Sequence, residues 1–92
     1  MRTYTLNSDI IIEPADDAAV LVNTKDECVY VLNSSAYILL KSILNSDNIS
    51  EATELYYAET GYPHTDIVKN DFDEFLNYLL SEKLLSRLHG EG

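Results

Sequence analysis

The first third of the chain alternates between short apolar segments and polar turns, a pattern typical of an antiparallel sheet. The signals for turns are Asp16-Asp17 and the polar tetrad at residues 24–27. The predicted strands are Asp9–Glu13 (closed by Pro14), Ala18–Asn23 and Cys28–Leu32. Parallel strands need a long crossover, so these short connections predict a three-stranded antiparallel meander in sequential order.

The rest of the chain has helical spacing, with a capping signal before each of three segments. The signals are Asn33-Ser34-Ser35 before the first helix, Asn48 with Glu51 as a capping box before the second, and Thr65 before the third. Gly61 and Pro63 end the second helix. The third and longest helix carries an apolar stripe formed by Val68, Phe72, Phe75, Leu76 and Leu79.

These elements place the chain in the α+β class, as a three-stranded antiparallel sheet followed by three helices, an arrangement that can form a winged helix-turn-helix. We expect one domain over residues 1–86 and a C-terminal tail over residues 87–92. The longest apolar runs, Ala18–Val22 and Ala36–Leu40, are too short to cross a bilayer or to form a signal-peptide core. With no export signal visible, we expect a cytoplasmic protein, and the single cysteine agrees with a reducing compartment.

The charge balance argues against nucleic acid and membrane partners. The net charge is -10, with acidic residues spread from Asp9 to Glu91, and such a surface repels phosphates and anionic lipids. Solubility alone explains this charge equally well. DNA recognition through the third helix is rejected, because Asp66–Glu82 carries five acidic residues and one lysine.

Residues able to do chemistry are few. Cys28 lies in an apolar strand, where we expect it to be a small buried side chain, and only His64 and His89 could serve it as a base. One cysteine and two distant histidines do not make a zinc site, and the acidic stretch at residues 71–74 lacks the glycine of a calcium loop. We therefore expect a non-catalytic binding protein with no cofactor and no bound metal.

The last predicted strand is the better candidate for a site. The first strand is protected against pairing by Asp9, Glu13 and Pro14, whereas Cys28–Leu32 has neither proline nor charge. Either another part of the chain covers this edge, or an extended peptide pairs with it by β-augmentation. Alternation puts Cys28, Tyr30 and Leu32 on one face of the strand and Val29 and Val31 on the other. The third helix, with Phe72, Phe75 and Leu76, is the candidate second wall, although such aromatics more often belong to a core.

Three segments resemble motifs of the PqqD-like family. Residues 29–40 resemble "Y-x-L-N-x-T-A-x-x-I", residues 68–76 resemble "V-x-x-D-V-x-x-F-L", and residues 79–85 resemble "L-x-x-x-G-L-L". The resemblance covers roughly Ile10 to Leu85, which is nearly the whole chain. The chain departs from the family at Lys83, which stands where glycine is usual, at Ser35, and between Asn23 and Glu27, where the hairpin glycine is missing.

The resemblance implies a recognition element for the leader of a ribosomally made precursor peptide. The family fold is winged-helix-like, and the leader adds as a strand beside the third strand and against the third helix. The resemblance implies that the leader pairs with Glu27, Cys28, Val29, Tyr30, Val31 and Leu32, and that Lys69, Asp71, Phe72, Phe75 and Leu76 border it. The implied partners are the precursor peptide and a modifying enzyme, such as a radical SAM enzyme, a cyclase or a protease. The alternative is an adaptor or scaffolding protein that uses the same edge to hold a partner or to dimerise.

Overall fold

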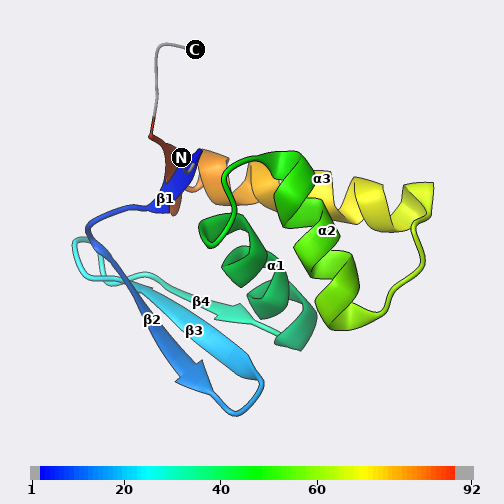
Figure 1. Ribbon diagram of the computed structural model, residues 1–92. Helices are drawn as coiled ribbons and strands as arrows, with labels where there is room; N and C mark the ends of the chain where they lie inside the picture. The colour runs from blue at the N-terminus through cyan, green and yellow to red at the C-terminus, as the bar shows by residue number, and fades with distance from the viewer. Residues whose placement is uncertain (1–2, 89–92) are drawn as a thin grey trace.

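The computed structural model describes residues 3–88 and has an α+β fold in which helices cover one face of a small sheet (Figure 1). The strands are β1 (Tyr4–Leu6), β2 (Ile10–Ala15), β3 (Ala18–Asn23), β4 (Val29–Leu32) and β5 (Leu85–Arg87). The helices are α1 (Ser34–Leu44), α2 (Ile49–Thr60) and α3 (Asp66–Ser81). The expected order of a sheet followed by three helices is confirmed.

The main sheet is the predicted meander, with strands in the order β2-β3-β4 and both pairs antiparallel. Leu21 of β3 stands opposite Ile12 of β2 and Tyr30 of β4. The expectation that Pro14 closes the first strand is wrong, because β2 continues through Pro14 to Ala15. A proline is tolerated there since β2 is an edge strand and needs no N–H on its outer side.

The two hairpins turn without glycine. Asp16, in the two-residue loop between β2 and β3, has a φ of 58°, and Glu27, before β4, has a φ of 65°. The second turn is held by the side chain of Asn23, whose Oδ1 accepts hydrogen bonds from the N–H groups of Lys25 (2.9 Å) and Asp26 (3.3 Å). Glu27 therefore occupies a left-handed position of the kind that favours glycine, which is the residue missing from this hairpin.

The helices begin where the capping signals predict. The caps are Asn33 for α1, Asn48 for α2 and Thr65 for α3, and each side chain accepts a hydrogen bond from the N–H three residues ahead. In α2 the return bond differs from the usual capping box, because Glu51 Oε1 accepts from Asp47 N–H at 2.8 Å. Gly61 ends this helix in a left-handed conformation, as predicted, with a φ of 73°.

A Schellman motif without glycine ends α3. The N–H of Lys83 donates to Leu80 O (3.1 Å), the N–H of Leu84 donates to Leu79 O (2.9 Å), and Lys83 has a φ of 61°. Leu84 is then fully buried in the core. Lys83 thus takes a left-handed conformation of the kind that favours glycine.

The chain continues from this cap into β5, which pairs with β1 in a second sheet of two strands. Ser86 faces Thr5, and Arg87 faces Tyr4. Arg87, the first residue that the sequence assigns to the tail, is thus paired with Tyr4 of the N-terminal strand. The last four residues of the predicted tail, 89–92, lie outside the described residues.

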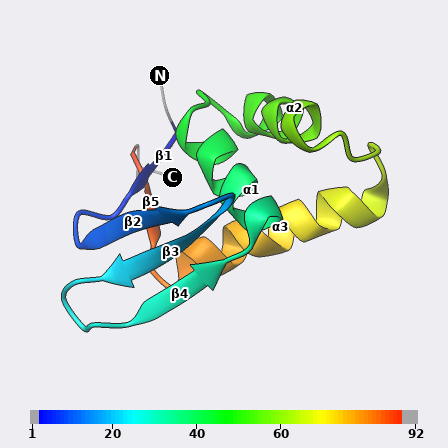
Figure 2. The same ribbon diagram turned by 90° about the horizontal axis from the view of Figure 1, so that it is seen from below.

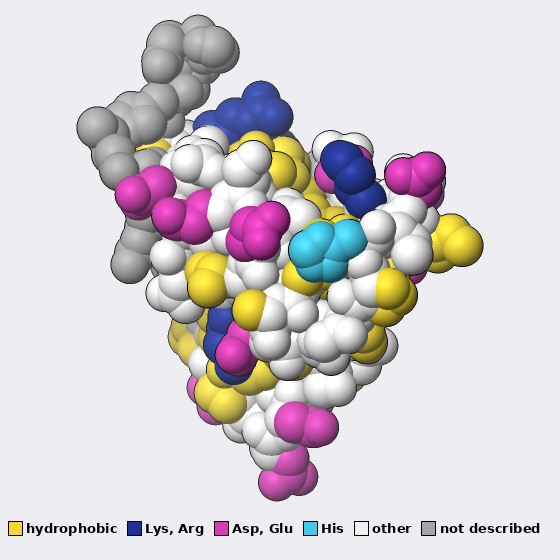
Figure 3. All heavy atoms as spheres, turned by 45° about the vertical axis from the view of Figure 1, so that its right-hand side comes forward, with side chains coloured by type: hydrophobic (Ala, Val, Ile, Leu, Met, Phe, Trp, Pro, Cys, Tyr) yellow, Lys and Arg dark blue, Asp and Glu magenta, His cyan; other side chains and the backbone are white. Residues whose placement is uncertain are grey.

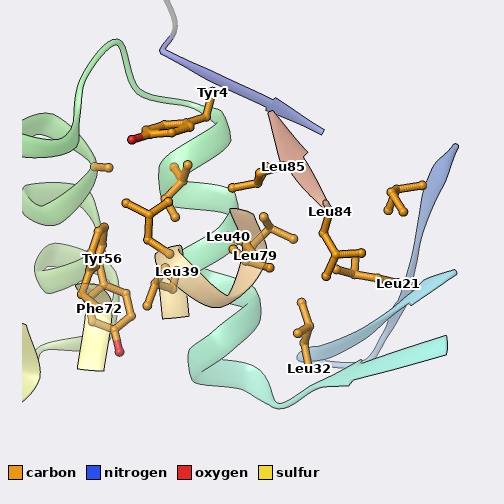
Figure 4. Close-up of a cluster of buried hydrophobic side chains, with 14 of the residues drawn as sticks. Tyr4, Leu21, Leu32, Leu39, Leu40, Tyr56, Phe72, Leu79, Leu84 and Leu85 are labelled. Atoms are coloured by element: carbon orange, nitrogen blue, oxygen red, sulfur yellow. The ribbon is translucent and has the colours of Figure 1, made fainter. Parts of the chain in front are cut away.

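The core lies between the sheet and the three helices (Figure 4). In that view Leu21 and Leu32 come from the sheet, Leu39 and Leu40 from α1, Tyr56 from α2, Phe72 and Leu79 from α3, and Leu84 from the segment after α3. All of these side chains are at most 5% exposed. Burying one such side chain contributes about 1.5–3 kcal/mol, so this cluster is the main source of stability.

The surface carries the acidic excess in a dispersed form. Figure 3 shows acidic side chains scattered over one face of the molecule, among uncharged residues and a few apolar ones. Over residues 3–88, none of the helices has the length and apolarity that a membrane span requires.

Candidate functional site

The outer side of β4 is a free margin of the sheet. β4 is the last strand in the order β2-β3-β4, and no other strand formed by residues 3–88 pairs with its outer side. Figure 2 shows β4 at the margin of the sheet, with the C-terminal half of α3 beside it. Within the described residues, therefore, the alternative that another strand of this chain covers the edge finds no support.

The hydrogen-bond pattern shows which main-chain groups face outward. Asn23 N–H donates to Cys28 O at 2.8 Å, so the residue pair 23–28 is directed toward the sheet. Because such pairs alternate along an antiparallel ladder, Tyr30 and Leu32 also direct their N–H and C=O groups toward β3. Val29 and Val31 direct theirs away from it. The edge thus offers the donors and acceptors of two residues to an incoming strand.

The other margin of the same sheet, strand β2, has fewer free main-chain donors. By the same alternation, Ile10, Ile12 and Pro14 of β2 face outward. The N–H of Ile10 already donates to Asn7 O at 3.0 Å, and Pro14 has no N–H. Only the N–H of Ile12 is left as an outward donor, so β2 is much less suited to strand addition than β4.

An aromatic row connects β4 to α3 on the inner face of the sheet. The rings of Tyr30 and Tyr78 meet edge to face, with centroids 6.4 Å apart, and the rings of Tyr78 and Phe75 stack at the same distance. Tyr78 is 44% exposed, whereas Tyr30 and Phe75 are half-buried. The row therefore presents apolar ring surface beside the open edge without being part of the buried core.

Tyr30 is also tied to the end of α3 by its hydroxyl, which donates to Glu82 Oε1 at 3.3 Å. Desolvation is the largest cause that raises the pKa of Tyr30, and the nearby Cys28 and Glu82 raise it further. The hydroxyl of Tyr30 therefore keeps its proton at neutral pH and can donate to Glu82.

These groups form one unit, which we call the edge site: Val29, Tyr30 and Val31 of β4 with Phe75, Tyr78 and Glu82 of α3 and its cap. On α3, Asp71, Phe75, Tyr78 and Glu82 follow the spacing i, i+4, i+7, i+11, which places them on one face of the helix. Tyr78 and Glu82 were not among the predicted site residues. The same spacing rule that found the apolar stripe could have found them, had polar and half-polar residues been included.

The other predicted site residues occupy several different environments. Phe72, Leu76 and Leu32 are buried in the core, with 2%, 8% and 4% exposure, so they support the site from beneath. Lys69 pairs with Asp73 (Nζ to Oδ2, 3.2 Å), and both side chains are exposed. Helical periodicity puts Lys69 about a third of a turn away from Phe75, off the face that meets β4.

Cys28 is exposed, so the expectation that it is a buried apolar side chain is wrong. The reason is that β4 begins at Val29, and Cys28 still belongs to the hairpin, where its N–H donates to Asp26 Oδ1 at 3.0 Å. The side-chain hydrogen bond with Asp26, followed by the negative charge of the same carboxylate, raises the pKa of the Cys28 thiol. A raised pKa disfavours the thiolate, which is the opposite of what a nucleophilic cysteine needs.

A polar pocket of about 680 Å³ adjoins the edge site at the start of β4. It lies between the link from β1 to β2, the β3–β4 hairpin and the cap of α3. The lining residues are Asn7, Ser8, Asp9, Ile10, Asn23, Lys25, Asp26, Glu82 and Lys83. Glu82 belongs both to this pocket and to the edge site, so the two are continuous. Within residues 3–88, this pocket included, no cluster of three or more His, Cys, Asp or Glu residues is arranged to hold a metal ion.

Comparison with known proteins gives the fold. No family model matches the chain, and no curated protein matches it. Among solved structures, "TbiB1 in Complex with the TbiA(beta) Leader Peptide" superposes with a TM-score of 0.75 at 18% sequence identity, over 100% of this chain and 99% of that chain. The two chains share one fold. In the other structure, this fold is bound to a leader peptide.

Proposed function

We propose that this protein binds the leader segment of a ribosomally synthesised precursor peptide, which adds as a strand to the outer side of β4. The observation that carries the proposal is the free margin of β4, where Val29 and Val31 direct their main-chain groups outward beside the aromatic row. The shared fold with TbiB1, a protein solved with a leader peptide, supports the same conclusion. So does the resemblance to PqqD-like motifs.

Strand addition accounts for the way this edge is built. An added strand exchanges hydrogen bonds with both outward-facing residues, and each such bond contributes about 0.5–1.5 kcal/mol net. The aromatic row supplies apolar contact to side chains that point inward, which main-chain pairing alone does not provide. This combination of main-chain pairing with side-chain pockets is the physical basis of β-augmentation.

The proposed role is to capture the peptide in the cytoplasm and to present it to a modifying enzyme. The exposed thiol of Cys28, next to the edge site in the chain, has a raised pKa, which disfavours the thiolate that a nucleophile needs. The chemistry is therefore assigned to a partner, such as a radical SAM enzyme, a cyclase or a protease. A non-catalytic chaperone needs only the open edge and the surface around it.

The second candidate is an adaptor that uses the same edge to hold a partner strand or to pair with another copy of itself. The observation in its favour is the outer face of the sheet, where Ile11, Val29 and Val31 are 46%, 58% and 80% exposed. The net charge of -10 opposes pairing between two copies, because like charges repel at short range. A light-scattering mass that equals a dimer and does not change with added peptide would favour this second candidate.

The direct test is titration of the ¹⁵N-labelled protein with the leader peptide encoded by a neighbouring gene, followed by NMR. The amides of Val29 and Val31 are expected to shift most, together with those of Phe75 and Tyr78 in α3. A scrambled leader of the same composition is the control and should leave these amides in place. Shifts confined to α2 and the outer face of α1 would contradict the proposal.

A pair of variants at Val31 tests strand addition itself. Val31→Pro removes one outward N–H and is expected to weaken leader binding about tenfold or more, because the lost bond leaves a ligand C=O unpaired. Val31→Thr keeps the N–H and the branched side chain, so it should bind like the wild type. Equal affinity of both variants would show that the main chain of β4 is not the binding element.

A further inference from the structure

The geometry of the edge determines which side chains of a bound strand can contact the inner face of the sheet and α3. Neighbouring strands share the alternation of their side chains, so a ligand residue beside Tyr30 points to the same inner face as Tyr30. Ligand residues beside Val29 and Val31 point to the outer face, where both valines are exposed. This holds for either direction of the added strand. Inward positions therefore recur at every second residue of the ligand.

The inward position beside Tyr30 meets ring surface. Tyr78 lies edge to face with Tyr30, at 6.4 Å between centroids, and 44% of Tyr78 is exposed. Phe75 stacks on Tyr78 with an interplanar angle of 19°, which extends the same surface along α3. Such a surface favours a large apolar or aromatic side chain, because ring contact removes apolar area from water on both sides.

The next inward position, two residues away and beside Cys28, meets the polar pocket. Asp26, which lines that pocket, accepts the N–H of Cys28 at 3.0 Å, and Glu82, also in the lining, accepts the hydroxyl of Tyr30 at 3.3 Å. The pocket of about 680 Å³ has room for a long side chain, and Lys25 and Asp26 of the hairpin that leads into β4 line it. A ligand side chain that leaves the aromatic row at this end is therefore directed into the pocket.

The charges at this end favour a cation. The pocket is lined by Asp9, Asp26 and Glu82, against Lys25 and Lys83, and within residues 3–88 no ion pair joins any of these carboxylates to either lysine. A hydrogen bond with Asp26 is the main cause that raises the pKa of Cys28, and desolvation is the main cause for Tyr30. The charges of Asp26 and Glu82 raise both pKa values further, as a negative local potential does. A lysine or arginine side chain of the ligand gains from that potential, while an acidic one is repelled.

Resting on the proposed function, we propose that the edge site recognises an extended segment in which a large apolar side chain and a lysine or arginine are separated by one residue. The apolar side chain packs on Tyr30 and Tyr78, and the basic side chain enters the polar pocket beside Asp26 and Glu82. The residue between them points to the outer face and is not selected. The site thus selects the spacing between the apolar and the basic side chain, and not only the presence of a positive charge.

The probes for this proposal are short threonine-rich peptides with blocked ends, each carrying one phenylalanine and one lysine. The lysine stands one, two or three positions from the phenylalanine, on either its N-terminal or its C-terminal side. Binding is followed through the amide shifts of Val29 and Val31 at low ionic strength. The peptide with a spacing of two, in one of the two orders, is expected to bind about threefold more tightly than its neighbours with odd spacing. The order that binds reports the strand direction.

Variants of the pocket complete the test. Asp26→Asn and Glu82→Gln keep their hydrogen-bond acceptors and should remove the preference for the spacing of two. Glu54→Gln, on the exposed surface of α2, removes one negative charge elsewhere and should keep the preference. This control separates the local effect of the pocket from the loss of net negative charge.

The outcomes distinguish this inference from the proposed function. If Val29 and Val31 respond equally to every spacing, or if the pocket variants keep the preference, the inference is wrong and strand addition stands. If the leader peptide moves these amides and the lysine peptides do not, the inference again fails alone. If neither moves them, the proposed function fails as well.

Discussion

Helix α3 carries two stripes that differ in what lies over them. The core stripe consists of Phe72, Leu76 and Leu79, which are 2%, 8% and 0% exposed. The edge stripe consists of Phe75, Tyr78 and Glu82, of which Tyr78 is 44% exposed. Both stripes have helical spacing and both contain an aromatic ring, so neither spacing nor ring content distinguishes them. The difference lies in the partners, since the core stripe meets the other helices and the edge stripe meets the free strand β4.

The two stripes allow one helix to serve stability and binding at once. Apolar area that is already buried in the folded chain stabilises the fold, and a ligand cannot remove it from water a second time. Apolar area that stays exposed beside an open strand contributes little to folding and becomes available on binding. The two stripes should therefore respond differently to the same kind of substitution.

The largest expected effect is on stability, from truncating the core stripe. Phe72→Ala should lower the free energy of unfolding by about 3–5 kcal/mol, because the ring is buried against Tyr56 with centroids 5.7 Å apart. Tyr78→Ala should lower it by about 1 kcal/mol or less, since 44% of this side chain is exposed and it lies outside the core. Urea denaturation followed by circular dichroism measures both. If Phe72→Ala prevents folding, Phe72→Leu provides a milder variant with a cost of about 1 kcal/mol.

The second effect is on leader affinity, for which the edge stripe should matter more than the core stripe. Tyr78→Ala is expected to weaken leader binding about tenfold, since it removes the exposed part of the aromatic row. Tyr78→Phe keeps the ring and should bind normally. Isothermal titration calorimetry with the leader peptide measures both affinities. If Tyr78→Ala binds the leader as tightly as the wild type does, the edge stripe does not contribute to leader binding. The two stripes would then differ in exposure but not in function.

The strands of the main sheet and the starts of all three helices could be predicted from the sequence because their signals are local. Alternation gives the strands, and the caps at Asn33, Asn48 and Thr65 are side chains that satisfy the first N–H groups of their own helices. The openness of the β4 edge also follows from local composition, since no proline or charge interrupts the strand. These features need no knowledge of the rest of the chain.

The missed features depend on contacts between distant parts of the chain. β1 and β5 have three residues each and pair across almost the whole chain, and no pattern of that length identifies a strand. Of the edge stripe, the sequence predicted only Phe75. Tyr78 and Glu82 count as polar, so a search for apolar spacing leaves them out. In the structure, Tyr78 stacks on Phe75, and Glu82 accepts a hydrogen bond from Tyr30. Cys28 was predicted to be the first residue of the strand, but the hairpin loop is one residue longer than the polar tetrad at residues 24–27 and includes Cys28.

A smaller effect on stability is expected at the cap where both stripes end. Lys83 has a φ of 61° although it has a Cβ, and left-handed backbone costs such residues more than it costs glycine. Lys83→Gly should therefore raise the free energy of unfolding by about 0.5–1 kcal/mol. Lys83→Ala also removes the long side chain but keeps the Cβ, so it should give no gain. A thermal melt separates the two, and a gain in both variants would point to the charge of Lys83 and not to its backbone.

The smallest effect concerns the thiol of Cys28, in the hairpin just before β4. The Asp26 carboxylate raises the pKa of this thiol, first as its hydrogen-bond partner and then through its charge, so the thiolate fraction at mildly alkaline pH is lower than for a free cysteine. Asp26→Asn keeps an oxygen for the Cys28 N–H but removes the charge, and should accelerate alkylation by iodoacetamide several-fold at about pH 8. Glu54→Gln, which removes a distant charge, should leave the rate unchanged. Bound leader should slow the same reaction in the wild type, because a strand along β4 covers the start of that edge, and a rate that leader does not change would place the ligand elsewhere.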